Sequence, residues 1–392
     1  MCRAHQNQAR AIIAAPSFNL TQLSIFYVTD QQEGRHSTVY DDAISEWVNA
    51  TLRMVLKRYR DGIVFDYEHP LKENSIEGEI YAKLIHATRD VFVTYNLSVT
   101  TCIPWSPDGI DGRYYPYKAL ENASDYLYVM DYDTQSQIMF GSCMANANAP
   151  YSGMIYGMNR YIDHYNISPN KLILGVPWYG YKYQCVQQQK IQDDNTPITD
   201  TTTNRLVIRA NTTTIDSNND ENNNNEDDGV INAVLHDTRF CPISLVSFRG
   251  VNCSDAAGNE IAYDKIMQLK AQQRQVLKVE VSKQETITTV IQIAGPVRRD
   301  SYQDAAYMNI AVVSLSSVLS TSSYRHQQYE MFQYWYDDPI SLRNKYSWAS
   351  NIKGGSLRGV GPYTFQYLNT IHDTKESSDM WTSFDEFFID TT

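Results

Sequence analysis

The octapeptide DGIVFDYE, residues 61–68, carries the sharpest chemical signal in this chain. Because side chains alternate across a strand, Val64, Asp66 and Glu68 share one face if the segment is extended. Two carboxyl groups this close raise one another's proton affinity, and burial adds to the effect. A carboxyl group that stays protonated near neutral pH is what a general acid needs. The motif therefore predicts an acid–base site, and two solvated acids at a strand end are the alternative.

Short apolar runs along the chain predict the strands that would position these acids: residues 11–15, 62–65, 97–103, 126–130, 172–176 and 357–360. Residues 41–58 and 77–91 lie between such runs, and the first of these segments repeats its apolar residues at helical spacing. Strands that alternate with helices indicate βαβ units and a parallel sheet. Over this chain length the pattern favours an α/β barrel, in which active sites lie at the C-terminal ends of the strands.

The middle of the chain has a different composition. Residues 211–229 form a polar, acidic, Asn- and Asp-rich stretch with too few apolar side chains to form a core. Residues 276–323 are rich in Ser, Thr and Val and show no regular alternation with helices. We therefore expect two barrel segments, residues 1–180 and 331–392, on either side of an insertion at residues 181–330.

The octapeptide resembles the strand-four signature of glycoside hydrolase family 18, commonly written DGxDxDxE. Six further segments, in the order expected, narrow the resemblance to the di-N-acetylchitobiase branch: YLYVMDYDTQSQI, ANAPY, KLILGVPWYGYKYQC, FRGVNCSDAAG, WYDDP and LRGVG. The resemblance implies a (β/α)8 TIM-type barrel with a smaller α+β insertion after strand seven. It also implies hydrolysis of the β-1,4 linkage of N,N′-diacetylchitobiose, in glycoprotein glycans or in chitooligosaccharides.

The same resemblance assigns catalytic roles to residues of this chain. Glu68 is expected to protonate the glycosidic oxygen while the acetamido carbonyl of the substrate attacks, an exception to the scheme with two carboxylates. Asp66 is expected to orient the acetamido N–H, and Tyr132 to bind the acetamido oxygen. Asp133 and Met130, in the same Met-x-Tyr-Asp motif, are expected to line the site.

Aromatic residues are expected to complete the sugar site. Trp105 and Trp178 are candidate walls, and packing within the barrel is the alternative for both. Tyr363 falls where the family carries a Trp on its last strand, and Val64 replaces an acidic or amide residue. These two departures keep a second function open, a chitin- or glycan-binding lectin with little or no activity. Hydrolysis of polymeric chitin is a third and weaker reading.

The start of the chain also departs from the family. Residues 1–13 resemble the second barrel strand, so we expect the first strand to be missing, and residues 17–36 and 309–323 to be inserts. An incomplete or misassembled gene product would explain these features.

Composition restricts the partners and the compartment. The net charge of −12 argues against a nucleic-acid binder, and no apolar stretch is long enough to span a membrane. Six cysteines without a CxxC pair or a nearby His cluster argue against a zinc site. An even number of cysteines and several Asn-x-Ser/Thr sequons favour disulfides in a secreted or lysosomal protein, with free thiols as the alternative. We expect no cofactor, an N-acetylglucosamine oligosaccharide as the partner, and a monomer.

Overall fold

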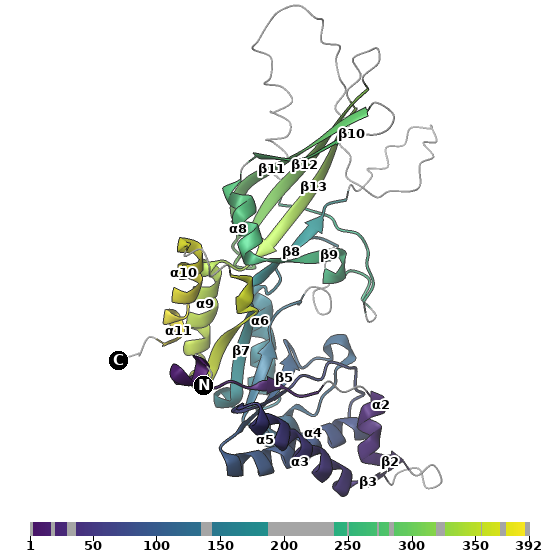
Figure 1. Cartoon of the computed structure of the whole chain (residues 1–392), viewed down its shortest axis with the longest axis vertical. Coiled ribbons are helices and arrows are strands. Elements are labelled where there is room, and N and C mark those ends of the chain that lie inside the picture. The colour runs from purple at the N-terminus through teal and green to yellow at the C-terminus, as the bar shows by residue number, and fades with distance from the viewer. Residues whose placement is uncertain are drawn as a thin grey trace, which may run out of the picture.

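The computed structural model describes residues 3–16, 20–29, 37–134, 143–186, 239–248, 251–272, 274–281, 286–318, 326–353, 355–368 and 374–388. Figure 1 shows two bodies within these residues, a parallel sheet flanked by helices and an antiparallel sheet that extends away from it. No described helix is long and apolar enough to cross a membrane.

The parallel sheet contains all six strands that the apolar runs predict. Their order across the sheet is β1-β4-β5-β6-β7-β14, and every neighbouring pair is parallel. The strands are β1 (Ile13–Ala14), β4 (Gly62–Phe65), β5 (Ser98–Pro104), β6 (Tyr126–Met130), β7 (Leu172–Pro177) and β14 (Gly359–Tyr363). Helices connect them: α3 (Asp41–Lys57), α4 (Ile76–Phe92), α5 (Tyr117–Ala123), α6 (Tyr151–Asn159) and α9 (Pro339–Ser350). The helices predicted at 41–58 and 77–91 are confirmed as α3 and α4.

Alternation along β4 divides the sheet into two chemical faces. Ile63, Phe65 and Tyr67 have exposed fractions of 0%, 0% and 1% and belong to the main hydrophobic core beneath the helices. Asp66 and Glu68 point to the opposite, concave face and reach solvent. The period of two predicted for this motif is therefore confirmed.

The number of strands corrects one expectation. Consecutive strands of a barrel lie side by side, and β1 pairs directly with β4, the strand of the signature motif. If the signature strand is the fourth, β1 takes the third position, not the second. Within the described residues the sheet thus holds six strands, two fewer than a complete barrel, and no pairing joins β1 to β14. Ile12, beside β1, is 44% exposed at this open edge.

The insertion begins directly after β7 and forms the antiparallel sheet, in the order β10-β11-β12-β13-β8-β9. Its elements are β8 (Tyr179–Gln184), β9 (Gly258–Ala262), α8 (Tyr263–Ala271), β10 (Arg274–Val281), β11 (Thr286–Asp300), β12 (Ala305–Val318) and β13 (His326–Tyr336). Most of the extension in Figure 1 is the hairpin of β11 and β12, with β10 and β13 beside them. The boundaries at 181 and 330 remain predictions, and the Asn-rich stretch 211–229 lies outside the described residues.

Short elements occupy the two ends of the chain. Near the N-terminus, α1 (Arg3–Gln6) precedes β1, and α2 (Leu20–Leu23) leads to a hairpin of β2 (Tyr27–Thr29) and β3 (Ser37–Val39). Near the C-terminus, α10 (Lys375–Thr382) and α11 (Asp385–Phe388) lie beside α9 (Figure 1). The predicted inserts at 17–36 and 309–323 are each only partly described.

Within the described residues the structure contains two disulfides: Cys143–Cys253 joins the insertion to the loop after β6, and Cys185–Cys241 joins two residues within the insertion. The sequence left the pairing open, and the structure assigns four of the six cysteines to these bonds. Cys102 is a buried free thiol, and Cys2 lies outside the described residues.

Candidate active site

The two acids of the signature motif lie at the C-terminal end of β4, where Glu68 contacts a buried arginine. The Arg113 Nη1 atom is 3.3 Å from the Glu68 Oε2 atom, and its Nη2 donates to Asp111 Oδ2 at 2.8 Å. The Arg113 side chain is 7% exposed, whereas that of Glu68 is 56% exposed. An acid that faces solvent thus lies beside a buried guanidinium.

Asp66 lies in a different electrostatic environment. The protein displaces water from part of the Asp66 carboxyl group, and this desolvation raises its pKa. A hydrogen bond from the Cys102 thiol and the positive charge of Arg113 act in the opposite direction. Cys102 belongs to the adjacent strand β5, and burial raises the pKa of its thiol well above the usual value. The thiol is therefore protonated and can donate to Asp66.

Tyr132 and Tyr363 form a stacked pair at the opposite side of the concave face. Their ring centroids are 4.8 Å apart and their planes differ by 10°. Tyr363 ends β14 and Tyr132 follows β6, so the pair spans β7, which lies between these strands. Burial raises the pKa of the Tyr132 phenol, and the charge of Asp66 acts in the same direction.

Asp133 faces the insertion. Its Oδ1 atom accepts hydrogen bonds from the Tyr179 hydroxyl at 2.6 Å and the Tyr181 hydroxyl at 2.9 Å, and both tyrosines belong to β8. Its backbone N–H donates to Asn148 Oδ1 at 2.6 Å. The φ angle of +52° turns the chain sharply here, which Asp tolerates better than most residues. Burial raises the pKa of Asp133, although two phenols stabilise its charged form.

Asp255 brings the insertion into the same acidic region. It opens the short helix η6 (Asp255–Ala257) within the DAAG segment. Burial raises its pKa to about 7, and the charges of Asp133 and Asp111 act in the same direction. Residues from β4, the loop after β5, the loop after β6 and the insertion thus surround one region.

Tyr128 forms the floor between these groups. It lies on the inner face of β6, and a Cβ atom at Gly175 of β7 would be 2.4 Å from its ring. The glycine therefore leaves room for the tyrosine ring. Met130, at the end of β6, is 8% exposed on the same inner face.

The two tryptophans are buried. Every second side chain of β7 faces the helix-side core, namely Leu172, Leu174 and Val176. Trp178, two residues further on, faces the same core. Trp178 is fully buried, with its ring 4.8 Å from that of Trp381 in α10. Packing, the alternative considered for this residue, accounts for it, and its ring has no surface to offer a sugar in this structure.

Trp105 follows β5 and is 3% exposed. Its carbonyl oxygen would be 2.0 Å from a Cβ atom at Gly157, so α6 packs closely against it. Both tryptophans therefore support the walls of the site from behind, while the aromatic surface on the concave side is supplied by tyrosines.

Several of these groups were not predicted from the sequence. Tyr179 and Tyr181 continue the alternation of β7 toward the inner side, so the segment WYGYKY contained the signal for them. Cys102 shares the inner face of a predicted strand, which was also detectable. Arg113 lies in a loop after β5, and no periodicity pointed to its contact with Glu68.

The family of the chain is shown by its similarity to known proteins. The family described as Glycosyl hydrolases family 18 matches residues 29–366. The chain belongs to this family. It is therefore a glycoside hydrolase by family, and its parallel sheet and helices represent the TIM-type fold expected from the sequence.

Curated relatives are similar over nearly the whole chain. Di-N-acetylchitobiase from Homo sapiens is 28% identical over 97% of this chain and 74% of its own length. Probable di-N-acetylchitobiase 1 from Dictyostelium discoideum is 29% identical over 99% of this chain and 79% of its own length. The resemblance to the chitobiase branch is thereby confirmed.

Solved chitinase structures share the fold. A class V chitinase from Nicotiana tobaccum has a TM-score of 0.55 at 15% identity, covering 97% of this chain and 82% of its own. A group IV chitinase from Ostrinia furnacalis has a TM-score of 0.53 at 15% identity, with the same coverage.

Proposed function

We propose that this family 18 glycoside hydrolase cleaves the β-1,4 linkage of N,N′-diacetylchitobiose units, in glycoprotein glycans or in chitooligosaccharides. The observation that carries the proposal is the common face of Asp66 and Glu68 at the end of β4, with Tyr132 stacked on Tyr363 after β6 of the same sheet. The names of the curated relatives support the choice of a chitobiose linkage over polymeric chitin.

In the proposed first step, Glu68 donates a proton to the glycosidic oxygen as the C1–O bond breaks. The acetamido carbonyl oxygen of the same sugar attacks C1 and forms an oxazolinium ion, so that no enzyme nucleophile is needed. Asp66 accepts a hydrogen bond from the acetamido N–H and stabilises the positive charge of the oxazolinium ion. The Tyr132 hydroxyl donates a hydrogen bond to the acetamido oxygen. Intramolecular attack benefits from proximity, worth on the order of 7–11 kcal/mol in favourable cases.

In the second step, water attacks C1 and opens the oxazolinium ion, and the Glu68 carboxylate takes the proton from that water. Two displacements at C1 give net retention of configuration. Arg113 supports this step because a guanidinium 3.3 Å from Glu68 favours the ionised carboxylate that acts as the base.

The sugar itself would rest on the tyrosines of the concave face. Tyr363, 46% exposed and stacked on Tyr132, presents a flat apolar ring with a polar hydroxyl, as carbohydrate sites require. Asp133 and Met130 border the same space. Tyr363 thus takes the role of the tryptophan that the family carries on its last strand.

One observation favours the alternative of a glycan-binding lectin with little activity. Position 64 is Val on the inner face of β4, so the side chain that precedes Asp66 there supplies neither a charge nor a hydrogen bond. The Cys102 thiol stabilises the charged form of Asp66 instead, and a thiol is a weak donor. A lectin would bind the same oligosaccharides without releasing products.

A product assay separates these functions. We would incubate the protein at acidic pH with di- and tri-N-acetylchitooligosaccharides and follow release of N-acetylglucosamine and its anomeric form by NMR. Initial release of the β-anomer supports the retaining hydrolase. Binding by calorimetry without any release supports the lectin, and release of the α-anomer would rule out the two-step mechanism.

We also propose an oxidising compartment, either lysosomal or extracellular, and action as a monomer. The two disulfides support the compartment because cytosolic reductants keep most protein thiols reduced. Localisation of a tagged full-length protein, with size-exclusion chromatography of the purified chain, tests both statements.

A further inference from the structure

Asp131 is a buried acid between two residues of the candidate site. It follows β6, and the alternation that turns Met130 and Tyr132 toward the concave face turns Asp131 the other way. Asp131 is 1% exposed, and neither of its carboxylate oxygens has a hydrogen-bond partner among the described residues. Its backbone N–H donates to Gly175 O at 3.0 Å, so the main chain here is held against β7.

The charges around Asp131 do not balance if it is ionised. Lys345 of α9 is fully buried, and its ammonium group donates to Asp337 Oδ1 at 2.8 Å and Oδ2 at 2.7 Å. It also donates to the carbonyl oxygen of Ala149. Lys345 and Asp337 are the charged groups whose fields act on Asp131. Among the described residues, Lys345 is therefore the one cation whose charge acts on both buried carboxyl groups, Asp131 and Asp337, and between these two it donates hydrogen bonds only to Asp337.

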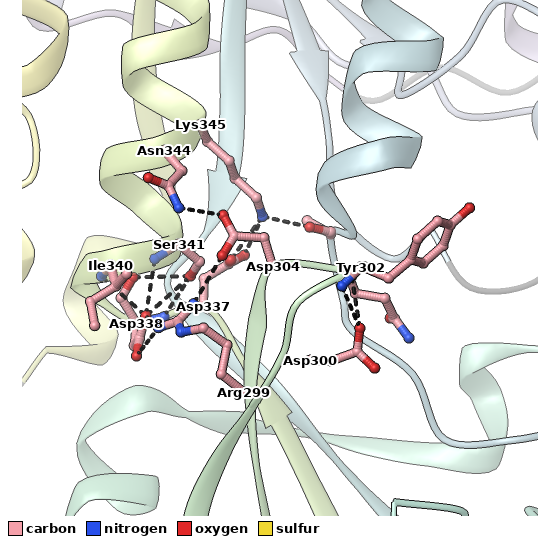
Figure 2. A network of polar contacts seen from close by, with 12 residues as sticks. Arg299, Asp300, Tyr302, Asp304, Asp337, Asp338, Ile340, Ser341, Asn344 and Lys345 are labelled. Carbon is pink, nitrogen blue, oxygen red and sulfur yellow. Dashed lines mark hydrogen bonds and ion pairs between the residues drawn. The ribbon is translucent and has the colours of Figure 1, made fainter.

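Figure 2 shows the polar contacts around Lys345. Lys345 points from α9 toward Asp337, and the neighbouring Asp338 caps the same helix through Ile340 and Ser341. Arg299 of β11 forms an ion pair with Asp338, which ties the insertion to this helix. Lys345 is thus not free to turn toward Asp131 without losing its bonds to Asp337.

A buried carboxylate without donors and without its own cation is costly, and the group avoids the cost by binding a proton. The balance of charge and hydrogen bonds therefore makes Asp131 the neutral member of the three. Burial raises its pKa to about 7, the charge of Lys345 opposes this rise, and that of Asp337 adds to it.

We propose that Asp131 is a positioning residue that holds Met130 and Tyr132 in place only while its carboxyl group is protonated. Ionisation puts an uncompensated charge beneath the Met-x-Tyr-Asp loop. Because Asp131 shares its peptide units with both neighbours, any movement that relieves this charge displaces the phenol expected to bind the acetamido group. The activity of the site would then be limited to acidic and neutral pH. This inference rests on the proposed function, but its protonation step does not.

The first test measures stability and needs no turnover. The folded pKa of Asp131 lies above its unfolded value of 3.8, so the contribution of Asp131 to the stability of the wild-type protein falls as pH rises from about 4 to about 7. Asp131→Asn matches the neutral form and does not titrate. We expect the Tm of Asp131→Asn minus that of the wild type to increase across this pH range and to level off above it.

The second test measures activity on di-N-acetylchitobiose from pH 5 to pH 8.5. If only the protonated form is active, the ratio of kcat/KM for Asp131→Asn over wild type rises about tenfold between pH 6 and pH 8. Asp255 is present in both proteins, so its own titration cancels from the ratio. Asp163→Asn, at an exposed acid, is the matched control and should give flat differences in both tests.

The outcomes separate the inference from the proposed function. A flat Tm difference overturns the protonation step, and a Tm difference that varies with a flat kcat/KM ratio overturns the positioning role. If no protein turns over substrate, the proposed function fails and the pH dependence of Tm still decides the protonation state. Asp131→Ser, smaller and neutral, replaces Asp131→Asn if the latter does not fold.

Discussion

The buried guanidinium of Arg113 lies 3.3 Å from the exposed carboxylate of Glu68, so the proposed general acid is held from one side by a fixed positive charge. The other nitrogen of that guanidinium is occupied by Asp111. One guanidinium therefore contacts both the proposed general acid Glu68 and the loop residue Asp111.

Replacement of Arg113 should therefore change the pH dependence of catalysis. The charge of Arg113 lowers the pKa of Asp66, so Arg113→Met should raise that pKa further. Because Asp66 must accept a hydrogen bond as a carboxylate, the acidic limb of kcat/KM should move to higher pH. Arg113→Lys keeps the charge and serves as the control. Equal shifts in both variants would show that lost geometry, not lost charge, is responsible.

Cys102 should support Asp66 through its thiol. The hydrogen bond from the thiol lowers the pKa of Asp66, and a net hydrogen bond is worth about 0.5–1.5 kcal/mol. Cys102→Ala should therefore move the acidic limb of kcat/KM upward by roughly half to one pH unit. Cys102→Ser retains a donor and should move it less. An unchanged pH profile in Cys102→Ala would exclude this contribution.

The stacked ring of Tyr363 should contribute to substrate binding. Aromatic stacking is worth about 0.5–1.5 kcal/mol beyond buried area, so Tyr363→Ala should raise KM or Kd by roughly 2- to 10-fold. Tyr363→Trp restores the residue type that the family carries at this strand and should bind at least as well as the wild type. Calorimetry with tri-N-acetylchitotriose measures both. Unchanged affinity in Tyr363→Ala would remove this ring from the sugar site.

The floor of the site should not tolerate a side chain at Gly175. The added methyl group would meet the Tyr128 ring at 2.4 Å, and overpacking of this kind costs about 1–3 kcal/mol. Gly175→Ala should therefore lower the free energy of unfolding in urea by that amount. Gly359→Ala, on β14, has its nearest neighbour at 4.0 Å and is the matched control. Equal stability of the two variants would contradict the packing described here.

The strands and the common face of Asp66 and Glu68 were predictable because burial leaves a period of two in the sequence. The same alternation continues past β7: Trp178 lies on the helix side of the sheet and Tyr179 on the concave side. The number of barrel strands was not predictable in this way. Apolar runs do not reveal their partners, and only the pairing of β1 with β4 shows which barrel position the first strand takes.

Contacts made by loops were the least predictable. Arg113 reaches Glu68 from a segment where Asp111 adopts a φ of +56°, and no pattern of residue types encodes that turn. Asp131 occupies the variable position of a recognised motif. Its buried and unpartnered state depends on Lys345, more than two hundred residues away in the sequence, which is committed to Asp337.

Turnover by Glu68→Gln tests the central claim most directly. Glutamine has nearly the same shape but cannot donate a proton, and general acid–base catalysis contributes about 10²- to 10⁴-fold. We predict that the kcat of Glu68→Gln on di-N-acetylchitobiose is lower than that of the wild type by at least about 10²-fold, while oligosaccharide affinity is retained. Glu46→Gln, on the exposed face of α3, is the control and should have wild-type kcat. Hydrolysis by Glu68→Gln at the wild-type rate would contradict the account.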